Sequence, residues 1–554
     1  MTGVSGTGWI ERRSRATGCL LDRKHSIATT GFNRWLVPPA ALCIHLCIGM
    51  SFGLSVFWLP LSRAIGIDRP VACSNQSLVA DLFTTTCDWQ LSNLLIIFTT
   101  GVAMLGFSAA LFGDWVERAG PRKAGAVAAC CWGGGFAIAA FGIYLHQLWI
   151  IWFGLGIVGG IGLGLGYIAP VSVLVNWFPD RRGMATGMAI MGFGGGAMIG
   201  SPLADILINT FKSPNSVGVA QAFLVLGAIY FMFMMIGAFA CRVTPIGWEP
   251  EGWTPTIRAG ALISTNSVDL ESTHNIPQFW LLWILFCMTV SAGIGVLALA
   301  SPMLQEVFGG ALIGKPDAGF TALDATERGT IASIGAGFVG LLSLFNIAGR
   351  LFWPALSDHI GRRNTFHLLF ILGVLLYASV PSFAHAGSRP MFVAALCMIV
   401  SVYGGSFATM PAYVADLFGP QFVGGIHGRL LTAWSTAGLA GPLLISYVRD
   451  VQLRAGVDRV LVYDRTMYLL SALLAIGLIA NVLIGPVAEK WHLSNDEAIR
   501  SQAESARSEP AVRRGTFGIG RGGLEPKVVM FWLLVGLPLA WGVARTLQNA
   551  AKIF

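Results

Sequence analysis

Long apolar stretches constrain this chain more than any other feature. A helix of about 20 mostly apolar residues can cross about 30 Å of hydrocarbon, and the chain is rich in such stretches: it is 55% hydrophobic and only 12% charged. The apolar runs are continuous instead of alternating, and they contain many Gly and Ala residues, which favours helices over the strands of a β-barrel. We therefore predict an all-α membrane protein.

The polar N-terminus is followed by a long apolar run without a small-residue cleavage site, so we interpret that run as a first span and not as a signal peptide. The predicted spans lie near 35–61, 91–112, 124–145, 148–176, 184–209, 218–241, 278–304, 329–353, 364–384, 390–414, 429–448, 466–486 and, as an extra C-terminal helix, 528–545.

The basic residues predict the orientation of the bundle. Of the 36 Lys and Arg residues, 23 lie in the N-terminal tail and the loops on its side, and 12 lie on the opposite side. Because cytoplasmic loops carry the excess of Lys and Arg, we expect a cytoplasmic N-terminus and a multi-pass protein of the plasma membrane, the inner membrane in a bacterium. The net charge of +8 is then a topology signal, and we expect no nucleic-acid partner.

The chain repeats itself at an offset of 241 residues. Gly120 and Gly361 are 241 residues apart, as are Pro170 and Pro411. Six spans repeated twice, with a binding site between the halves near the midplane, are typical of secondary transporters. The predicted parts are a cytoplasmic tail (1–34), an N-terminal six-helix half (35–241), a cytoplasmic linker (242–277), a C-terminal six-helix half (278–486), a polar cytoplasmic linker (487–527) and the extra helix (528–545).

Two repeated loops, "ERAGPRK" and "SDHIGRR", resemble the signature of the major facilitator superfamily, which implies a 6+6 helix bundle with pseudo-twofold halves. We expect each loop carboxylate to cap the next helix and hold arginines of its own loop. The loops would then latch the outward-open state; alternatively, their charges only anchor the loops. The predicted gating residues are Gly113, Glu117, Arg118, Gly120, Arg122, Asp358, Gly361, Arg362 and Arg363.

Arg350 lies between two apolar runs, about 12 Å along the helix from Asp358. Such a charge usually faces a bundle interior or a watery cavity; the alternative is that its long stem snorkels toward the cytoplasm and pairs with Asp358 or a carbonyl. Asn346, one turn earlier, extends a polar stripe on the same helical face. This stripe favours a role for Arg350 in binding an anion, whose two oxygens a guanidinium can meet at once.

Within the major facilitator superfamily, residues 162–197 and 404–419 resemble the oxalate/formate antiporter family. The resemblance implies that Arg350 binds a substrate carboxylate and that Tyr167 and Tyr403 line the pocket. Trp434 stands where the oxalate transporter has a second cation, a lysine. With one cation left, charge balance favours a monocarboxylate such as formate, lactate or pyruvate. Phe52 and Trp434 would complete an aromatic cage, although ordinary packing explains each aromatic alone about as well.

The sequence leaves the energy coupling open. Asn346 cannot carry a proton, and His45 in the first span could. Exchange of carboxylates needs no proton carrier, so antiport is our first hypothesis and proton symport the alternative. A carboxylate sensor that transports nothing is a further alternative.

The sequence also bears on catalysis, cofactors, partners and disulfides. No set of catalytic or metal-binding residues converges in the spans, so we expect neither an enzyme nor a cofactor. We expect a monomer in the lipid bilayer that binds small carboxylate anions. Cys73 and Cys87 share an outside loop, where they either form a disulfide or remain free thiols.

Overall fold

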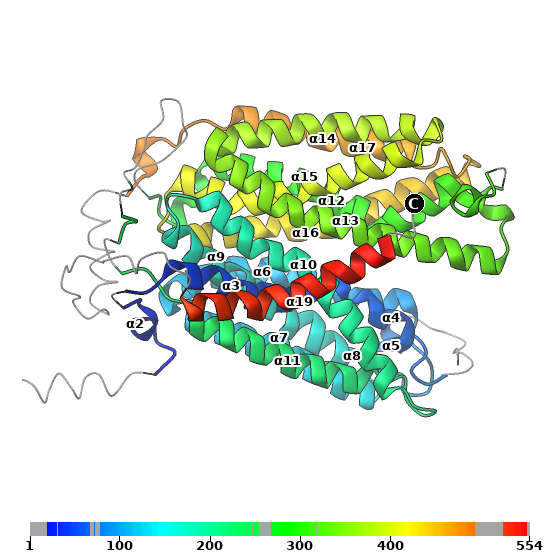
Figure 1. Cartoon of the computed structure of the whole chain (residues 1–554), viewed down its shortest axis with the longest axis horizontal. Helices are drawn as coiled ribbons and strands as arrows, with labels where there is room; N and C mark the ends of the chain where they lie inside the picture. Colours follow the sequence, from blue (N-terminus) through cyan, green and yellow to red (C-terminus); the bar gives the residue numbers. More distant parts are fainter. Residues whose placement is uncertain are drawn as a thin grey trace, which may run out of the picture.

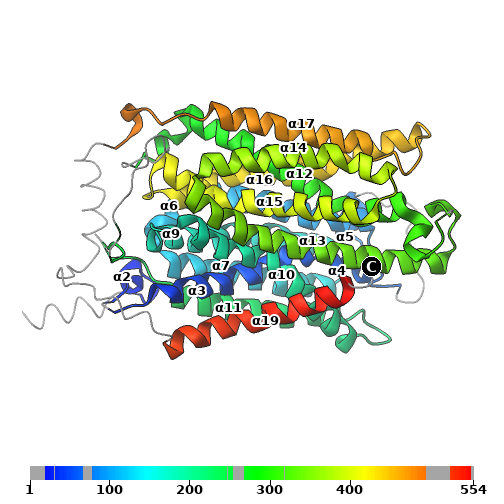
Figure 2. The ribbon, with the colours of Figure 1, turned by 45° about the horizontal axis from the view of Figure 1, so that its top comes forward.

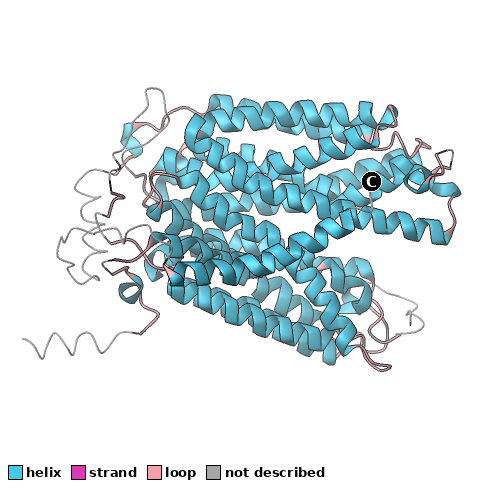
Figure 3. Ribbon diagram, in the orientation of Figure 1, coloured by secondary structure: helices cyan, strands magenta, loops and turns pink. Residues whose placement is uncertain are grey.

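The computed structural model describes residues 19–29, 31–66, 71, 78–245, 248–251, 253, 267–316, 318–493 and 525–550. In these ranges the chain forms helices joined by loops, without a strand (Figure 3). Thirteen of the described helices are long and apolar enough to cross a membrane. The predicted all-α membrane fold is therefore confirmed, including the extra C-terminal helix.

Two groups of six spans lie one above the other in Figure 1. The first group, called the N-half here, contains α3 (Val37–Ile48) with its continuation α4 (Ser55–Leu61), α6 (Leu91–Ala119), α7 (Pro121–Tyr144), α8 (Leu148–Ile151) with its continuation α9 (Gly159–Trp177), α10 (Arg182–Phe211) and α11 (Val219–Ala240). The second group, called the C-half, contains α12 (Pro277–Phe308), α13 (Ala325–Ile360), α14 (Arg362–His385), α15 (Arg389–Phe418), α16 (Val423–Arg454) and α17 (Asp464–Leu483).

Gly120 and Gly361 form the turns between consecutive helices at matching places in the two halves. Their φ angles are 81° and 88°, a region that side chains rarely adopt because the Cβ atom clashes with the backbone. These glycines let α6 turn directly into α7 and α13 into α14. The end of the bundle that carries them is called the motif end here.

The halves meet mainly through two helix pairs, α6 with α16 and α10 with α13, and further contacts join α10 with α15 and α9 with α16. A methyl group at Gly113 on α6 would lie 2.9 Å from the Cα atom of Gly425 on α16, and one at Gly187 on α10 would lie 2.4 Å from the carbonyl oxygen of Arg350 on α13. Small residues permit this close backbone approach, which is how helices pack in lipid without a hydrophobic driving force. The pairs therefore seal the halves together from the motif end to the middle.

The extra helix α19 (Pro526–Ala550), in red, crosses the boundary between the halves in Figure 1 and lies at the edge of the bundle in Figure 2. It packs against α3 and α10 of the N-half and α13 of the C-half. Next to Gly195 on α10, side chains of Leu539 on α19 and Ile347 on α13 converge. The thirteenth helix thus packs on the face of α13 that carries Leu344, Ile347 and Leu351, next to the face of Asn346 and Arg350.

Candidate functional site

Arg350 lies deep within α13, about 15 Å along the helix from its end at Ile360. Its side chain is 1% exposed. The Nε atom donates to the side-chain oxygen of Asn346 (2.7 Å), and Nη1 donates across the half boundary to the carbonyl oxygen of Ile190 on α10 (3.1 Å). Asp358 pairs with Arg362 instead. The expected alternative pair with Asp358 is therefore not formed, and the carbonyl that Arg350 contacts is that of Ile190 on the facing helix α10.

Two phenylalanine rings face the Arg350 guanidinium. Its Cζ atom lies 4.8 Å from the ring centroid of Phe407 on α15 and 5.9 Å from that of Phe193 on α10, both within the range of cation–π attraction. The sequence carries no distinctive signal for either residue, because a phenylalanine in an apolar span resembles any core residue. The repeat could have found Phe193, which lies 241 residues before Trp434.

The four aromatic residues predicted for the cage converge on this pair of phenylalanines. Their ring centroids lie at the following distances: Tyr167 5.6 Å from both Phe193 and Phe407, Trp434 6.3 Å from Phe193 and 6.4 Å from Phe407, Tyr403 6.4 Å from Phe407, and Phe52 5.0 Å from Phe193. Together these six residues are called the aromatic cluster here. Members come from both halves, so the cluster lies at their interface.

Arg350 has no carboxylate within 4.0 Å among the residues that the structure describes. A buried charge without a partner is strongly unfavourable unless hydrogen bonds or a ligand compensate it. The surroundings also contain poorly satisfied polar groups: Nδ1 of His427 has no partner, and the Tyr403 hydroxyl lies close to Nε1 of Trp434 without a hydrogen bond of good geometry. Leaving such groups unpaired costs about 1–3 kcal/mol each. The arrangement can hold a small anion with polar oxygens.

Two histidines flank Tyr167. The His45 ring stacks on the Tyr167 ring at 5.4 Å, and its nitrogens contact the carbonyl oxygens of Ala189 (2.8 Å) and Tyr167 (3.1 Å). The Nε2 atom of His427 lies 3.4 Å from the Tyr167 hydroxyl oxygen. Sequence analysis missed His427 because it predicted a span from 429, whereas α16 begins at Val423.

At the motif end, each loop carboxylate caps a helix of the opposite half. Glu117 accepts hydrogen bonds from the Gly424 amide in the first turn of α16 (2.9 Å) and from the Ser172 hydroxyl (2.8 Å). Asp358 accepts from the amides of Gly183 (2.9 Å) and Met184 (2.8 Å) in the first turn of α10. The expectation that these carboxylates cap the next helix was therefore wrong: Gly120 and Gly361 turn the chain too tightly, and the opposite half supplies the open amides.

The basic residues of the two loops behave differently. Arg362 lies 2.7 Å from Asp358 of its own loop and 3.3 Å from Asp416, which also pairs with Arg182 at 3.3 Å. In the first loop, Glu117 receives no hydrogen bond from Arg118 or Arg122, contrary to expectation, because these two arginines bind Asp114 and the Leu20 carbonyl instead. The remaining predicted residues lie apart: Arg118 pairs with Asp114, Arg122 donates to the carbonyl of Leu20, and Arg363 donates to that of Val482.

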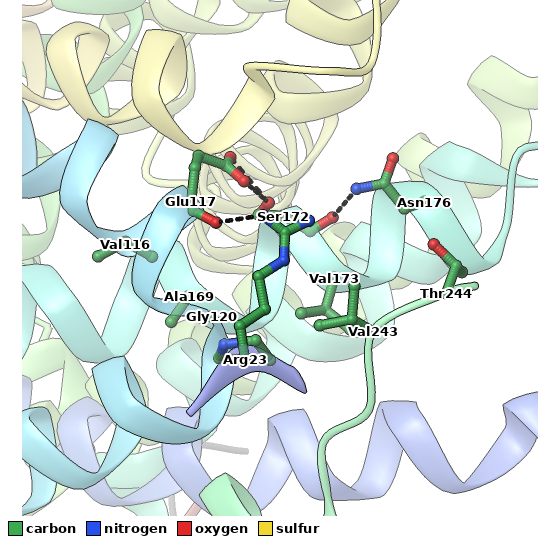
Figure 4. A pocket seen from close by; sticks show the side chains of 11 residues that line it. Arg23, Val116, Glu117, Gly120, Ala169, Ser172, Val173, Asn176, Val243 and Thr244 are labelled. Atoms are coloured by element: carbon green, nitrogen blue, oxygen red, sulfur yellow. Dashed lines mark hydrogen bonds between the residues drawn. The ribbon is translucent and has the colours of Figure 1, made fainter. Parts of the chain in front are cut away.

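A small pocket of about 40 Å³ lies beside Glu117 at the motif end. Figure 4 shows the Arg23 side chain reaching into it toward Glu117, with Ser172 and Asn176 on its far side. Arg23 Nη1 donates to the backbone carbonyl of Glu117 (2.9 Å). This space has room for about one water molecule, so the aromatic cluster remains the candidate substrate site.

Cys87 is disulfide-bonded, and Cys73 lies outside the described residues. Their pairing stays a prediction.

Residues 41–442 match the family model of the Major Facilitator Superfamily. The chain belongs to this superfamily. The fold agrees with solved structures. The proton:xylose symporter XylE matches with a TM-score of 0.60 at 13% identity, covering 84% of this chain and 99% of that one. The transporter FucP matches with a TM-score of 0.54 at 14% identity, covering 81% of this chain and 99% of that one. The protein is thus a multi-pass membrane transporter of this fold and not an enzyme.

Three of the relatives that this chain resembles are named as transporters of carboxylates. An oxalate:formate antiporter of Oxalobacter formigenes is 27% identical over 51% of this chain, and the match spans only 59% of that protein. An apicoplast pyruvate carrier of Toxoplasma gondii is 23% identical over 84% of this chain and 92% of its own. Monocarboxylate transporter 11 of Mus musculus is 24% identical over 75% and 81%.

Proposed function

We propose that this protein is a secondary active transporter of small carboxylates that works by alternating access, as an antiporter with a preference for monocarboxylates. The observation that carries the proposal is Arg350, a buried cation without a carboxylate partner among the described residues, in an aromatic cluster at the interface of the halves. A substrate carboxylate would supply the missing negative charge. Arg350 would meet both of its oxygens, which an ammonium group cannot do in the same geometry.

The predicted roles divide as follows. Arg350, held by Asn346, binds the carboxylate; Tyr167, Tyr403, Trp434 and Phe52 enclose the small apolar remainder of the substrate. Glu117 and Asp358 cap helices of the opposite half, so rocking of the halves breaks these hydrogen bonds at the motif end. We place that end in the cytoplasm, in the inner membrane of a bacterium, on the distribution of Lys and Arg.

Counterflow in proteoliposomes tests the proposal. Vesicles with purified protein are loaded with unlabelled formate, lactate or oxalate, and uptake of the labelled compounds is followed. We expect uptake of monocarboxylates that requires an internal carboxylate, with oxalate slower. Uptake driven by a pH gradient without internal substrate would instead favour proton symport. If no small carboxylate is taken up under either condition, the proposal is wrong.

A further inference from the structure

His427 is a buried titratable group at the substrate site that the transport cycle described above does not use. It lies on the second turn of α16 and is 0% exposed. Its Nε2 atom is 3.4 Å from the Tyr167 hydroxyl, its single polar contact among the described residues, and its Nδ1 atom has no partner. A neutral imidazole that only fills space would lose free energy through the unpaired nitrogen.

His45 is the contrasting case on the other side of Tyr167. Both of its ring nitrogens contact backbone carbonyl oxygens, which only accept hydrogen bonds, so even a protonated His45 has no N–H left to donate to a substrate. Those two contacts fix its ring between α9 and α10, which is a structural role. Of the two histidines, His427 is the one whose nitrogen without a protein partner can donate to a substrate carboxylate once it carries a proton.

Few ionisable groups surround His427. The His427 ring centroid lies 5.7 Å from that of Tyr167 on α9 and 6.3 Å from that of Phe286 on α12. Phe286 in turn stacks on Phe407, the ring that faces Arg350. The helices packed against α16 are α6, α9, α12, α15 and α17. Tyr167 is the titratable group that contacts the His427 ring among the described residues. Glu117 on α6 binds the Gly424 amide one turn before His427, and α12 and α15 carry Cys287 and Tyr403. α17 makes no polar or ring contact with His427.

We propose that His427 binds a proton when a dicarboxylate occupies the site, and that this proton supplies the second positive charge. The inference rests on the proposed carboxylate transport. With His427 neutral, Arg350 balances a monocarboxylate. With His427 protonated, Arg350 and His427 together balance a short dicarboxylate, whose second carboxylate would otherwise be desolvated without a partner. The proton comes from water on the loading side and returns to water on the release side.

Charge counting gives this scheme a distinctive consequence. A dicarboxylate carrying one proton has a net charge of −1, as does a monocarboxylate. Exchange of the two is therefore electroneutral, whereas exchange of a bare dicarboxylate for a monocarboxylate moves one charge across the membrane. An imposed potential of about 100 mV would bias the latter exchange by up to about fiftyfold.

The experiment uses the full-length protein in proteoliposomes loaded with formate, and measures the ratio of oxalate uptake to formate uptake from pH 7.5 to 5.5. Both substrates stay ionised in this range because their last carboxyl groups titrate near pH 4. We expect the wild-type ratio to rise as pH falls, by up to about tenfold per pH unit. His427→Gln, which keeps polar atoms but cannot titrate, should flatten this slope, and the matched control His45→Gln should keep it.

A second measurement covers the case in which His427→Gln does not fold. Wild-type vesicles containing a pH-sensitive dye should acidify during oxalate uptake but not during formate uptake, and oxalate:formate exchange should be insensitive to a potassium diffusion potential. A wild-type ratio that does not change with pH, or a slope retained in His427→Gln and lost in His45→Gln, would overturn the assignment. Absence of formate counterflow at every pH would instead overturn the proposed function itself.

Discussion

Glu117 and Asp358 lie 241 residues apart at matching positions of the two halves, and each accepts a hydrogen bond from a matching amide, Gly424 or Gly183, at 2.9 Å. The side chains around them do not match. Asp358 belongs to a chain of ion pairs with Arg362, Asp416 and Arg182. The Glu117 carboxylate has a hydroxyl and an amide as its hydrogen-bond donors. The hydrogen bond from loop carboxylate to helix amide is therefore repeated in both halves, whereas the ion pairs occur only around Asp358 of these two carboxylates.

The same division occurs at the substrate site. A methyl group at Gly187 would lie 2.4 Å from the carbonyl oxygen of Arg350, and one at Gly428 would lie 2.4 Å from that of Ala109. These two contacts are related by the repeat offset of 241 residues. The side chain at the matching position is a methyl group in Ala109 of the N-half and a guanidinium group in Arg350 of the C-half. The N-half contributes mainly apolar surface to the site, and the C-half contributes its charge.

The largest expected effect comes from changing the charged side of this comparison. Arg350→Lys keeps the charge but loses the two-pronged geometry and the Nε hydrogen bond to Asn346. We expect substrate affinity to fall at least about tenfold, or about 1.4 kcal/mol, measured by substrate-induced thermal shift and by counterflow. Affinity near that of the wild type would indicate that Arg350 only anchors charge.

A second cation in the C-half should change the preferred substrate charge. Trp434→Lys adds a partner for a second carboxylate, and we expect the ratio of oxalate to formate transport at pH 7.5 to rise about tenfold, in line with one added charge pair. Trp434→Met removes the ring without adding charge and is the control. A wild-type preference for oxalate at this pH would contradict the argument that one cation sets the substrate charge.

The two loop carboxylates should differ in their contribution to stability. Asp358→Asn leaves the buried Arg362 with Asp416 as its remaining carboxylate partner, and we expect a loss of about 2 kcal/mol in the free energy of unfolding. Glu117→Gln keeps an oxygen that can accept from the Gly424 amide, so we expect a loss of about 1 kcal/mol or less. Thermal unfolding in nanodiscs compares the two variants. Equal losses would show that the ion pairs of the C-half add nothing.

The smallest effect concerns the end opposite the motif end, where the halves also differ. In the C-half, Glu306 binds Arg449, Arg459 and Tyr463 there, whereas the N-half has Cys87 in its first loop. We expect peptide mass spectrometry without reduction to find Cys73 and Cys87 joined in protein exported to an oxidising face. Finding both thiols open to alkylation would reject the pairing.

The sequence by itself determined the all-α fold, the repeated halves and the unusual position of Arg350. These properties depend on local hydrophobicity, on spacing and on the cost of placing a charge in hydrocarbon, all of which can be evaluated along the chain. It also indicated Tyr167 and Tyr403 of the aromatic cluster through the family resemblance, and Phe52 and Trp434 as the residues that complete it.

Only the tertiary structure decided which groups meet across the halves. Glu117 and Asp358 cap helices that lie far from them in the chain, Phe193 and Phe407 face Arg350, and His427 enters the site because α16 begins earlier than its hydrophobicity indicates. Apolar packing residues and helix-end polar residues carry no distinctive sequence signal. Their partners are set by how two helix bundles approach one another, which is a property of the assembled chain and not of any segment.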